Sequence, residues 1–263
     1  TLKHGLRTAC FAERTVVAAG GAVPIPKELP LWQAALLGCG VVTGMGAVRN
    51  VARVQPGESV AVFGCGGVGL QVVAAARLAG AAPIVAVDRV AEKLELARAQ
   101  GATHVVDAST EEKPVSAIRR LTGGGADFAF EVIGLPETIR LAWGAIRPGG
   151  SVVVVGLAPV GVEASVPAIE FLSDKSLLGT YYGSGDPAAE LPELARLALD
   201  GEESADDPQM LEMRDRLQEG EPGLERREVG SERLEHDLPG GGIPRPDQLG
   251  HVEQPPVVME QYL

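Results

Sequence analysis

The sequence predicts an α/β fold built on a doubly wound parallel sheet. Between residues 59 and 183, short segments rich in Val, Ile and Ala alternate with helical patterns of about 10–15 residues, which is typical of right-handed βαβ units. Few polar residues interrupt the apolar segments, so we expect helices on both faces of the sheet. The composition agrees, because the chain is 45% hydrophobic but only 4% aromatic.

The expected elements follow one another in a regular order. Glycines 123–125 end the third expected helix, and residues 148–150 (Pro-Gly-Gly) form a turn into the fifth expected strand. We expect strands at 59–64, 84–88, 104–107, 127–133, 151–156 and 176–183, and helices at 67–78, 90–100, 115–121 and 136–147.

Charge and cysteine usage narrow the class of protein. The 263 residues carry a formal net charge of −12, which argues against nucleic acid and anionic membrane surfaces as partners. Cys10, Cys39 and Cys65 lie far apart with no CxxC pair, which favours a reducing cytoplasm over a disulfide framework. We find no signal peptide and no apolar run of the roughly 18–20 residues that span a bilayer. The chain begins at Thr1 rather than Met, which favours a longer natural protein.

Residues 201–263 differ from the rest of the chain. They hold 16 acidic residues and 6 arginines, with 8 glycines and 7 prolines, while Leu, Ile, Val and Phe together number 12. Such a segment buries too little apolar surface to fold. Two interpretations remain open, a disordered acidic tail and a frameshifted or mis-joined end, and neither supports a function.

A glycine-rich loop follows the first expected strand. Gly64, Cys65, Gly66, Gly67, Val68 and Gly69 match G-x-G-x-x-G, and a helix is expected directly after them. In this motif Gly64 permits the tight turn, Gly66 lets a pyrophosphate approach the backbone, and Gly69 lets the helix lie close to the strand. The helix N-terminus then offers N–H groups and a partial positive charge to the phosphates. Cys65 fills a variable position of the motif, where packing is favoured over a redox role.

An acidic residue completes the dinucleotide pattern. Asp88 ends the next expected strand, 19 residues after Gly69, where a carboxylate accepts hydrogen bonds from both ribose hydroxyls of adenosine. A carboxylate there repels a 2′-phosphate, which favours NAD over NADP, although the adjacent Arg89 is able to accommodate NADP in part. The alternative is that Asp88 only ends the strand or caps the next helix.

With these motifs the chain resembles the zinc-containing, medium-chain alcohol dehydrogenases, over about residues 10–200. The combination of LLGCGVVTG with AVFGCGGVGL, in which Cys39 and Gly64 lie 25 residues apart, is more specific than the glycine loop alone. Within the family, the chain most resembles the branch of the class III and the bacterial mycothiol- or nitrosoaniline-dependent enzymes. The matching stretches are Phe11–Val17, Ala35–Ala47, Val60–Leu70, Ile84–Asp88, Ala126–Gly134 and Gly149–Leu157.

The resemblance implies roles for individual residues. Cys39 falls at the third catalytic zinc ligand, and Thr43 at the threonine that packs against the nicotinamide and serves the catalytic site. Lys93 falls where a lysine reaches the adenosine ribose. Positions implied around the rest of the cofactor are Val132 and Gly134 on the loop after the fourth strand, and Val155, Leu157, Thr180 and Tyr182 around the carboxamide.

The chain also departs from the family pattern. Catalysis there needs zinc on three protein ligands with one open position, so that the metal binds the alcohol oxygen while hydride passes to NAD. The first Cys ligand, the proton-relay Ser/Thr, the His-Glu ligand segment and the four-cysteine structural zinc lobe belong to an N-terminal lobe that this chain lacks. Only Cys39 remains, so the zinc site is incomplete.

These expectations combine into one organisation of the chain. We expect a remnant of the GroES-like catalytic lobe at 1–30, an NAD-binding Rossmann domain at 31–185, a helix at 186–200 and the acidic tail from 201. By resemblance the function is that of a cytoplasmic oxidoreductase, an NAD- and zinc-dependent alcohol dehydrogenase acting on an alcohol or aldehyde, and homo-oligomeric at full length. The alternatives are a non-catalytic NAD-binding fragment or pseudoenzyme and a methyltransferase, against which the Cys39–Thr43 segment counts.

Overall fold

The computed structural model of the protein describes residues 16–17 and 21–199. All of these residues belong to one structural unit. The expectations for residues 201–263 lie outside the described residues, as do most of those for the lobe remnant at 1–30.

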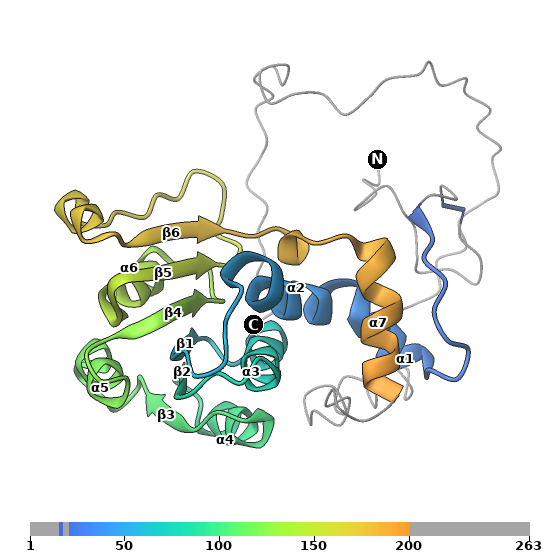
Figure 1. The fold of residues 1–263 in the computed structure, drawn as a ribbon, viewed down its shortest axis with the longest axis horizontal. Coiled ribbons are helices and arrows are strands. Elements are labelled where there is room, and N and C mark those ends of the chain that lie inside the picture. The colour runs from blue at the N-terminus through green and yellow to red at the C-terminus, as the bar shows by residue number, and fades with distance from the viewer. Residues whose placement is uncertain (1–15, 18–20, 200–263) are drawn as a thin grey trace, which may run out of the picture. The chain divides into compact units, whose positions relative to one another are not determined.

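A six-stranded sheet forms the centre of this unit (Figure 1). Its order is β3-β2-β1-β4-β5-β6, and every neighbouring pair is parallel, as the alternation of strands and helices predicts. The chain therefore adds β2 and β3 on one side of β1, crosses back, and adds β4, β5 and β6 on the other side. The strands are β1 (Val60–Phe63), β2 (Ile84–Asp88), β3 (His104–Asp107), β4 (Ala126–Glu131), β5 (Ile146–Val154) and β6 (Ser176–Gly179).

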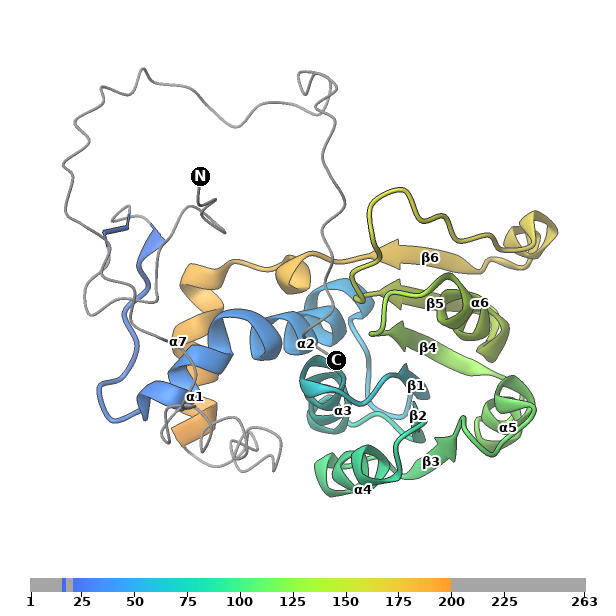
Figure 2. The same cartoon turned by 180° about the vertical axis from the view of Figure 1, so that it is seen from behind.

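Helices cover both faces of the sheet, and two cores result (Figures 1 and 2). Helices α3 (Gly67–Leu78) and α4 (Ala91–Gln100) pack on one face, and α5 (Pro114–Leu121) and α6 (Pro136–Ala145) on the other. Because side chains of a strand alternate between faces, Val60 and Val62 of β1 enter the first core while Ala61 and Phe63 enter the second. This confirms the expected cover on both faces for the inner strands such as β1 and β2, whereas β6 at one edge of the sheet is largely exposed.

A long helix precedes the sheet. It runs without a break from Leu31 to Ala52 as α1 (Leu31–Leu36), the π-helical η3 (Leu37–Val41), α2 (Val42–Gly46) and the π-helical η4 (Ala47–Ala52). By length and composition it passes the test for a membrane-spanning helix, so the expectation that no apolar segment reaches that length is wrong. The same character suits a core helix, and Leu37, Val41, Val42 and Met45 are buried in the first core.

The last elements lie beside this helix. After β6 come a short 3₁₀ turn, η6 (Tyr182–Ser184), and α7 (Pro187–Leu199), which packs against the long helix in both views. The helix α7 agrees with the one expected at 186–200. A further 3₁₀ segment, η5 (Ala168–Ser173), precedes β6.

Two strands differ by more than two residues from the boundaries expected from the sequence. The fifth begins at Ile146 rather than Ser151, because Ile146 pairs with Ala126 before the register shifts, so that residues 148–150 lie within the strand and not in a turn before it. The sixth ends at Gly179 rather than Gly183, and the left-handed backbone angles of Tyr182 and Gly183 rule out a strand as far as Gly183.

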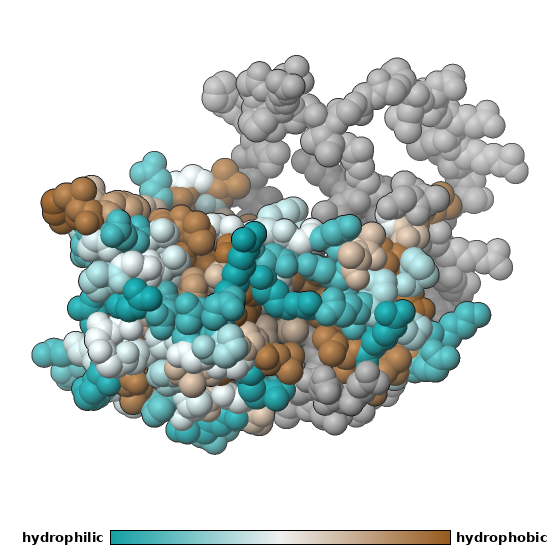
Figure 3. Space-filling model, in the orientation of Figure 1, coloured by the Kyte–Doolittle hydropathy of each residue, from teal (hydrophilic) through white to brown (hydrophobic). Residues whose placement is uncertain are grey.

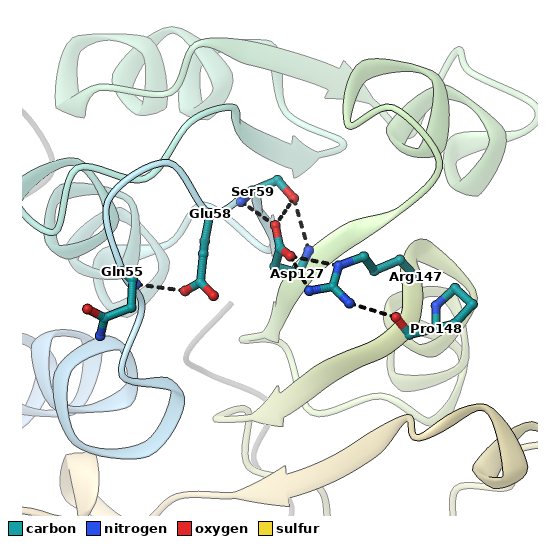
Figure 4. Close-up of polar contacts among 6 residues, drawn as sticks. All are labelled: Gln55, Glu58, Ser59, Asp127, Arg147 and Pro148. Atoms are coloured by element: carbon teal, nitrogen blue, oxygen red, sulfur yellow. Dashed lines mark hydrogen bonds and ion pairs between the residues drawn. The ribbon is translucent and has the colours of Figure 1, made fainter.

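A polar cluster joins the amino ends of the three central strands β1, β4 and β5 (Figure 4). The carboxylate of Asp127 accepts hydrogen bonds from the backbone N–H and the hydroxyl of Ser59, at 2.7 and 2.6 Å. Its other oxygen accepts a bond from Nε of Arg147 at 2.7 Å. Although burial opposes ionisation, these hydrogen bonds and the Arg147 charge lower the pKa of Asp127. The cluster lies at the edge opposite the glycine loop and is structural.

We expect Asp127→Asn to lower the free energy of unfolding by about 1–3 kcal/mol at pH 7, because the charge-assisted bonds are lost. A lowered pKa means that this stabilisation is present above the ordinary Asp value of 3.8 and is lost as the pH falls through the lower native value. Urea unfolding of both proteins between pH 7 and pH 3 measures the difference.

The exposed hydrogen bond from the Gln55 N–H to Glu58 on the same edge supplies the control. Glu58→Gln should unfold close to wild type throughout. A difference between wild type and Asp127→Asn that stays constant down to pH 3 would contradict the role of the ionised carboxylate.

Candidate functional site

The carboxyl edge of the sheet contains the point where the strand order reverses. The neighbours of β1 are β2 and β4, and the connections from β1 and β3 lead in opposite directions. Open α/β sheets bind ligands at such a switch point, outside the carboxyl ends of the strands. The glycine loop, Asp88 and the loops after β4, β5 and β6 all start from this edge.

The glycine loop has the geometry that its sequence predicts. Gly64 has a φ of +98°, which favours glycine, and its N–H donates to the Val87 carbonyl oxygen of β2 at 2.8 Å. A Cβ on Gly69 would overlap the carbonyl oxygen of Gly64, so the close approach of α3 to β1 requires a glycine there. A Cβ on Gly66 or Gly67 would meet no atom within 4 Å. The loop is therefore closed toward the protein and open on the side where a ligand would lie.

Asp88 is bonded to the glycine loop itself. One carboxylate oxygen accepts the backbone N–H of Cys65 at 2.7 Å, and the other accepts those of Arg89 at 2.7 Å and Val90 at 3.0 Å. Asp88 therefore does form the turn into α4, as the alternative interpretation had it. It also fixes the loop of the neighbouring strand, a contact that the sequence pattern did not indicate. Because each carboxylate oxygen has two lone pairs, these three bonds leave one lone pair, on the oxygen bonded to Cys65, for a ribose hydroxyl.

Cys65 and Lys93 lie close to this part of the edge. Cys65 is fully buried, and burial together with the Asp88 charge raises the pKa of its thiol to about 12. This confirms packing as the role of Cys65. The half-buried Lys93 of α4 lies near enough that its charge counteracts part of this rise.

Glu131, the last residue of β4, organises the next two loops. One oxygen of its fully buried carboxylate accepts the backbone N–H groups of Ile133 and Gly134 at 3.0 and 2.9 Å, and the Thr138 hydroxyl at 2.7 Å. Its backbone carbonyl accepts the N–H groups of Val155 and Gly156 at 2.8 and 2.9 Å. Sequence analysis missed Glu131, since a single acid within an apolar strand has no spacing that marks it.

Most of the residues implied for the cofactor are thereby gathered at one edge. Val132 and Gly134 lie beside Val155, and a Cβ on Gly134 would come within 2.6 Å of the Leu157 backbone. Thr180 donates its N–H to the Val154 carbonyl oxygen at 3.1 Å, which continues the edge to the segment after β6.

The turn η6 brings Tyr182 to the long helix. Burial first, then the neighbouring Cys39 and Tyr181, raises the pKa of Tyr182. Tyr182 and Ser184 have φ of 49° and 55°, and left-handed angles cost a residue with a side chain about 1–3 kcal/mol each. The surrounding contacts must offset this strain.

Cys39 and Thr43 lie on the long helix, one turn apart. Cys39 is exposed and Thr43 is partly buried. The helix is held next to the glycine loop by Gly44, whose Cβ would come within 2.8 Å of the Val68 carbonyl oxygen. Among the residues that the structure describes, no three His, Cys, Asp or Glu side chains are grouped so that they could hold a metal ion.

The parallel order, the open glycine loop and the acid at the end of β2 together define a dinucleotide-binding α/β domain. Residues 67–200 match the zinc-binding dehydrogenase family, and the chain belongs to that family. This confirms the resemblance inferred from the sequence motifs.

Similar proteins agree with this assignment. The chain is 40% identical over 204 residues to an S-(hydroxymethyl)glutathione dehydrogenase of Synechocystis sp., covering 77% of this chain and 55% of that protein. It is 37% identical over 201 residues to alcohol dehydrogenase 1 of Pisum sativum, covering 76% and 53%. The crystal structure of benzyl alcohol dehydrogenase from Acinetobacter calcoaceticus matches with a TM-score of 0.68 at 36% identity, covering 76% of this chain and 57% of that one. The chain thus spans about half the length of the curated relatives it matches.

The two described cysteines should differ sharply in reactivity. In a Cys10→Ser background at pH 8, we expect a thiol reagent to modify the exposed Cys39 within minutes and to leave Cys65 unmodified until the protein unfolds. Burial raises the pKa of the Cys65 thiol, so the thiol stays protonated at pH 8, and burial also keeps the reagent away from it. Absorbance of the released chromophore follows the reaction.

The matched variant is Cys39→Ser in the same background. It should show no fast phase in native protein and one reactive thiol in denaturant. A fast phase that persists in this variant would contradict the burial of Cys65.

Proposed function

We propose that the described residues form the NAD-binding part of a zinc-type alcohol dehydrogenase, which transfers hydride between an alcohol or aldehyde and NAD. The observation that carries this proposal is the open glycine loop tied by its Cys65 N–H to the carboxylate of Asp88 at the switch point of the sheet. Membership of the zinc-binding dehydrogenase family supports the reaction class.

The position of each loop suggests how the cofactor lies along the edge. Asp88 follows β2, so the adenosine ribose would lie on that side, with the pyrophosphate on the backbone of Gly66 and the first turn of α3. The nicotinamide would then lie beyond β1, near the loops after β4, β5 and β6. Thr43 would close the site from the long helix.

The carboxylate of Asp88 favours NAD. It accepts three backbone N–H groups but remains an acceptor only, so it would repel a 2′-phosphate. A dehydrogenase from Sinorhizobium meliloti was solved bound to NADP and matches this chain at 28% identity with a TM-score of 0.61, so a relative with this fold takes the phosphorylated cofactor. The choice in this chain therefore rests on Asp88 and Arg89.

The described residues do not by themselves fit a catalytic zinc. Such a site needs three protein ligands, and Cys39 is the described residue that the family resemblance places there. Since no group of three ligating side chains occurs among the described residues, these residues do not account for a metal-dependent step. A non-catalytic NAD-binding fragment or pseudoenzyme is the alternative that this observation favours. The methyltransferase alternative lacks such support, since residues 67–200 match a zinc-binding dehydrogenase family.

We also propose a homo-oligomer in the cytoplasm, with neither nucleic acid nor membrane as partner. The free thiols of Cys39 and Cys65 suit a reducing compartment. Strand β6 is one of the two edge strands of the sheet, and Figure 3 shows apolar side chains gathered over it and over η5. An apolar edge of this kind suits pairing with a second copy. Its partly or largely exposed members include Ile169, Phe171, Leu172, Leu177 and Leu178.

Gly66→Val tests the NAD site directly. The variant should fold normally, because a Cβ there meets nothing within 4 Å, yet its side chain would occupy the place of the pyrophosphate. We expect the Kd for NADH to rise about tenfold or more, equivalent to about 1.4 kcal/mol, in a fluorescence titration or calorimetry.

Gly21→Val is the matched control, since a Cβ on Gly21 also meets nothing within 4 Å and Gly21 belongs to neither the sheet nor its loops. It should bind NADH like wild type. Equal NADH affinity of wild type and Gly66→Val would refute the assignment of the loop.

Asp88→Ser tests cofactor choice. It removes both the charge that repels a 2′-phosphate and the acceptor that fixes the Cys65 N–H, so two effects are expected. The Kd for NADH should rise about tenfold, and the ratio of NADPH affinity to NADH affinity should increase, helped by Arg89. Titrations with both reduced cofactors give the ratio.

Asp107 supplies a matched control, because it pairs in register with Asp88 at the end of the adjacent strand β3 and also accepts a following backbone N–H, that of Ser109 at 2.8 Å. Asp107→Ser should leave the ratio unchanged. An unchanged ratio in Asp88→Ser would reject the role of Asp88.

A further inference from the structure

Three consecutive residues after β6 adopt left-handed backbone angles. Tyr182, Gly183 and Ser184 have φ of 49°, 74° and 55°, and two of them carry side chains that disfavour this region. Around the turn, the Ser184 N–H donates to the Tyr181 carbonyl oxygen, and the Thr180 and Ser184 hydroxyls are hydrogen-bonded to each other, both at 3.0 Å. So short a turn needs support from elsewhere in the fold.

The support comes from the end of the long helix. The side-chain amide nitrogen of Asn50 donates one hydrogen bond to the Gly183 carbonyl oxygen at 3.0 Å and another to a carboxylate oxygen of Glu190, in α7, at 2.7 Å. Both partners are acceptors only, so an NH₂ group with two donors is the group that satisfies them. Asn50 is 133 residues from Gly183 and 140 from Glu190 in the sequence.

Close backbone packing makes this contact specific. A Cβ on Gly46, one turn before Asn50, would come within 2.5 Å of the Gly183 carbonyl oxygen. A Cβ on Gly183 would overlap the Val42 carbonyl oxygen. The turn therefore lies directly on the helix backbone, and Asn50 binds the Gly183 carbonyl oxygen that lies against Gly46.

We propose that Asn50, oriented by Glu190, is a positioning residue that holds the turn Tyr182–Ser184 in place for the nicotinamide end of the cofactor. The inference rests on the proposed function, in which the nicotinamide lies near the loop after β6, and on the family resemblance, which implies that Thr180 and Tyr182 lie at the carboxamide. Asn50 touches no reacting atom; it acts through the Gly183 carbonyl.

The sheet order limits the effect to one end of the dinucleotide. Four strand spacings separate β2, which carries Asp88, from β6, which leads into the turn, and they amount to about 19 Å. Release of the turn should weaken contacts with the nicotinamide and leave those with the adenosine unchanged. A general loss of stability would affect both ends.

The test compares NADH with ADP-ribose, which lacks the nicotinamide. In Asn50→Leu, similar in size but without a donor, we expect the Kd for NADH to rise about tenfold and that for ADP-ribose to stay within about twofold of wild type. Asn50→Asp should have at least as large an effect, because its carboxylate cannot donate and faces the carboxylate of Glu190.

Arg49→Ala is the matched control. Arg49 lies next to Asn50 and also binds α7, through Glu193 at 2.8 Å, but it does not touch the turn. It should bind both ligands like wild type. Hydrogen exchange supplies a measurement that needs no cofactor: the amides of Tyr182–Gly185 should exchange faster in Asn50→Leu than in Arg49→Ala, while those of Arg89 and Val90 should not change.

The outcomes separate the two proposals. A wild-type chain that binds neither NADH nor ADP-ribose would overturn the proposed function. If the wild type binds NADH, two results would overturn the positioning role alone. One is an equal Kd for NADH in Asn50→Leu, and the other is a rise in the Kd for ADP-ribose as large as the rise for NADH. Unchanged amide hydrogen exchange of the turn in Asn50→Leu would show that Asn50 does not hold the turn and would overturn the proposal.

Discussion

The close approach of α3 to β1 is the constraint on which the rest of the structure depends. It requires a glycine at position 69, which lies against the Gly64 carbonyl oxygen. This contact fixes where the first turn of α3 lies at the carboxyl edge of the sheet. Once α3 has this position, the long helix follows, because Gly44 packs directly on the Val68 carbonyl of α3. The long helix in turn fixes the position of the turn after β6, since Gly46 and Gly183 pack backbone to backbone. Three glycine contacts thus link the position of α3 on β1 to the position of the turn after β6.

The sequence predicts well whatever depends on local pattern. The glycine loop, Asp88 and helices α3 and α4 all appear within one or two residues of their expected positions, because apolar periodicity and glycine spacing act over short distances. The start of β5 was misplaced, since Pro-Gly-Gly within a strand is tolerated in this sheet only through a register shift against β4.

The contacts of the site that sequence analysis missed are long-range. Asn50 gains its importance from partners more than 130 residues away, and nothing in the sequence around it marks an asparagine at the end of an apolar helix. Glu131 serves two loops that follow two different strands, and only the parallel pairing of β4 with β5 brings the second within reach of its carbonyl. The zinc ligation of Cys39 rests on the family resemblance alone, because the described residues provide no companion ligands.

The carboxylates of Asp88 and Glu131 fix the loops at the carboxyl edge of the sheet, but the two side chains differ in their exposure and therefore in what they can bind. Asp88 and Glu131 each end a strand next to β1, and each collects the backbone N–H groups of the loops around it. Glu131 is fully buried, so it can order its loops but cannot touch a ligand. Asp88 remains partly exposed, so the same carboxylate can fix the glycine loop and present its remaining lone pair to a sugar. An aspartate at this position therefore couples the shape of the phosphate-binding loop to the choice of ribose, and a change made to alter cofactor preference also disturbs the loop that binds the phosphates.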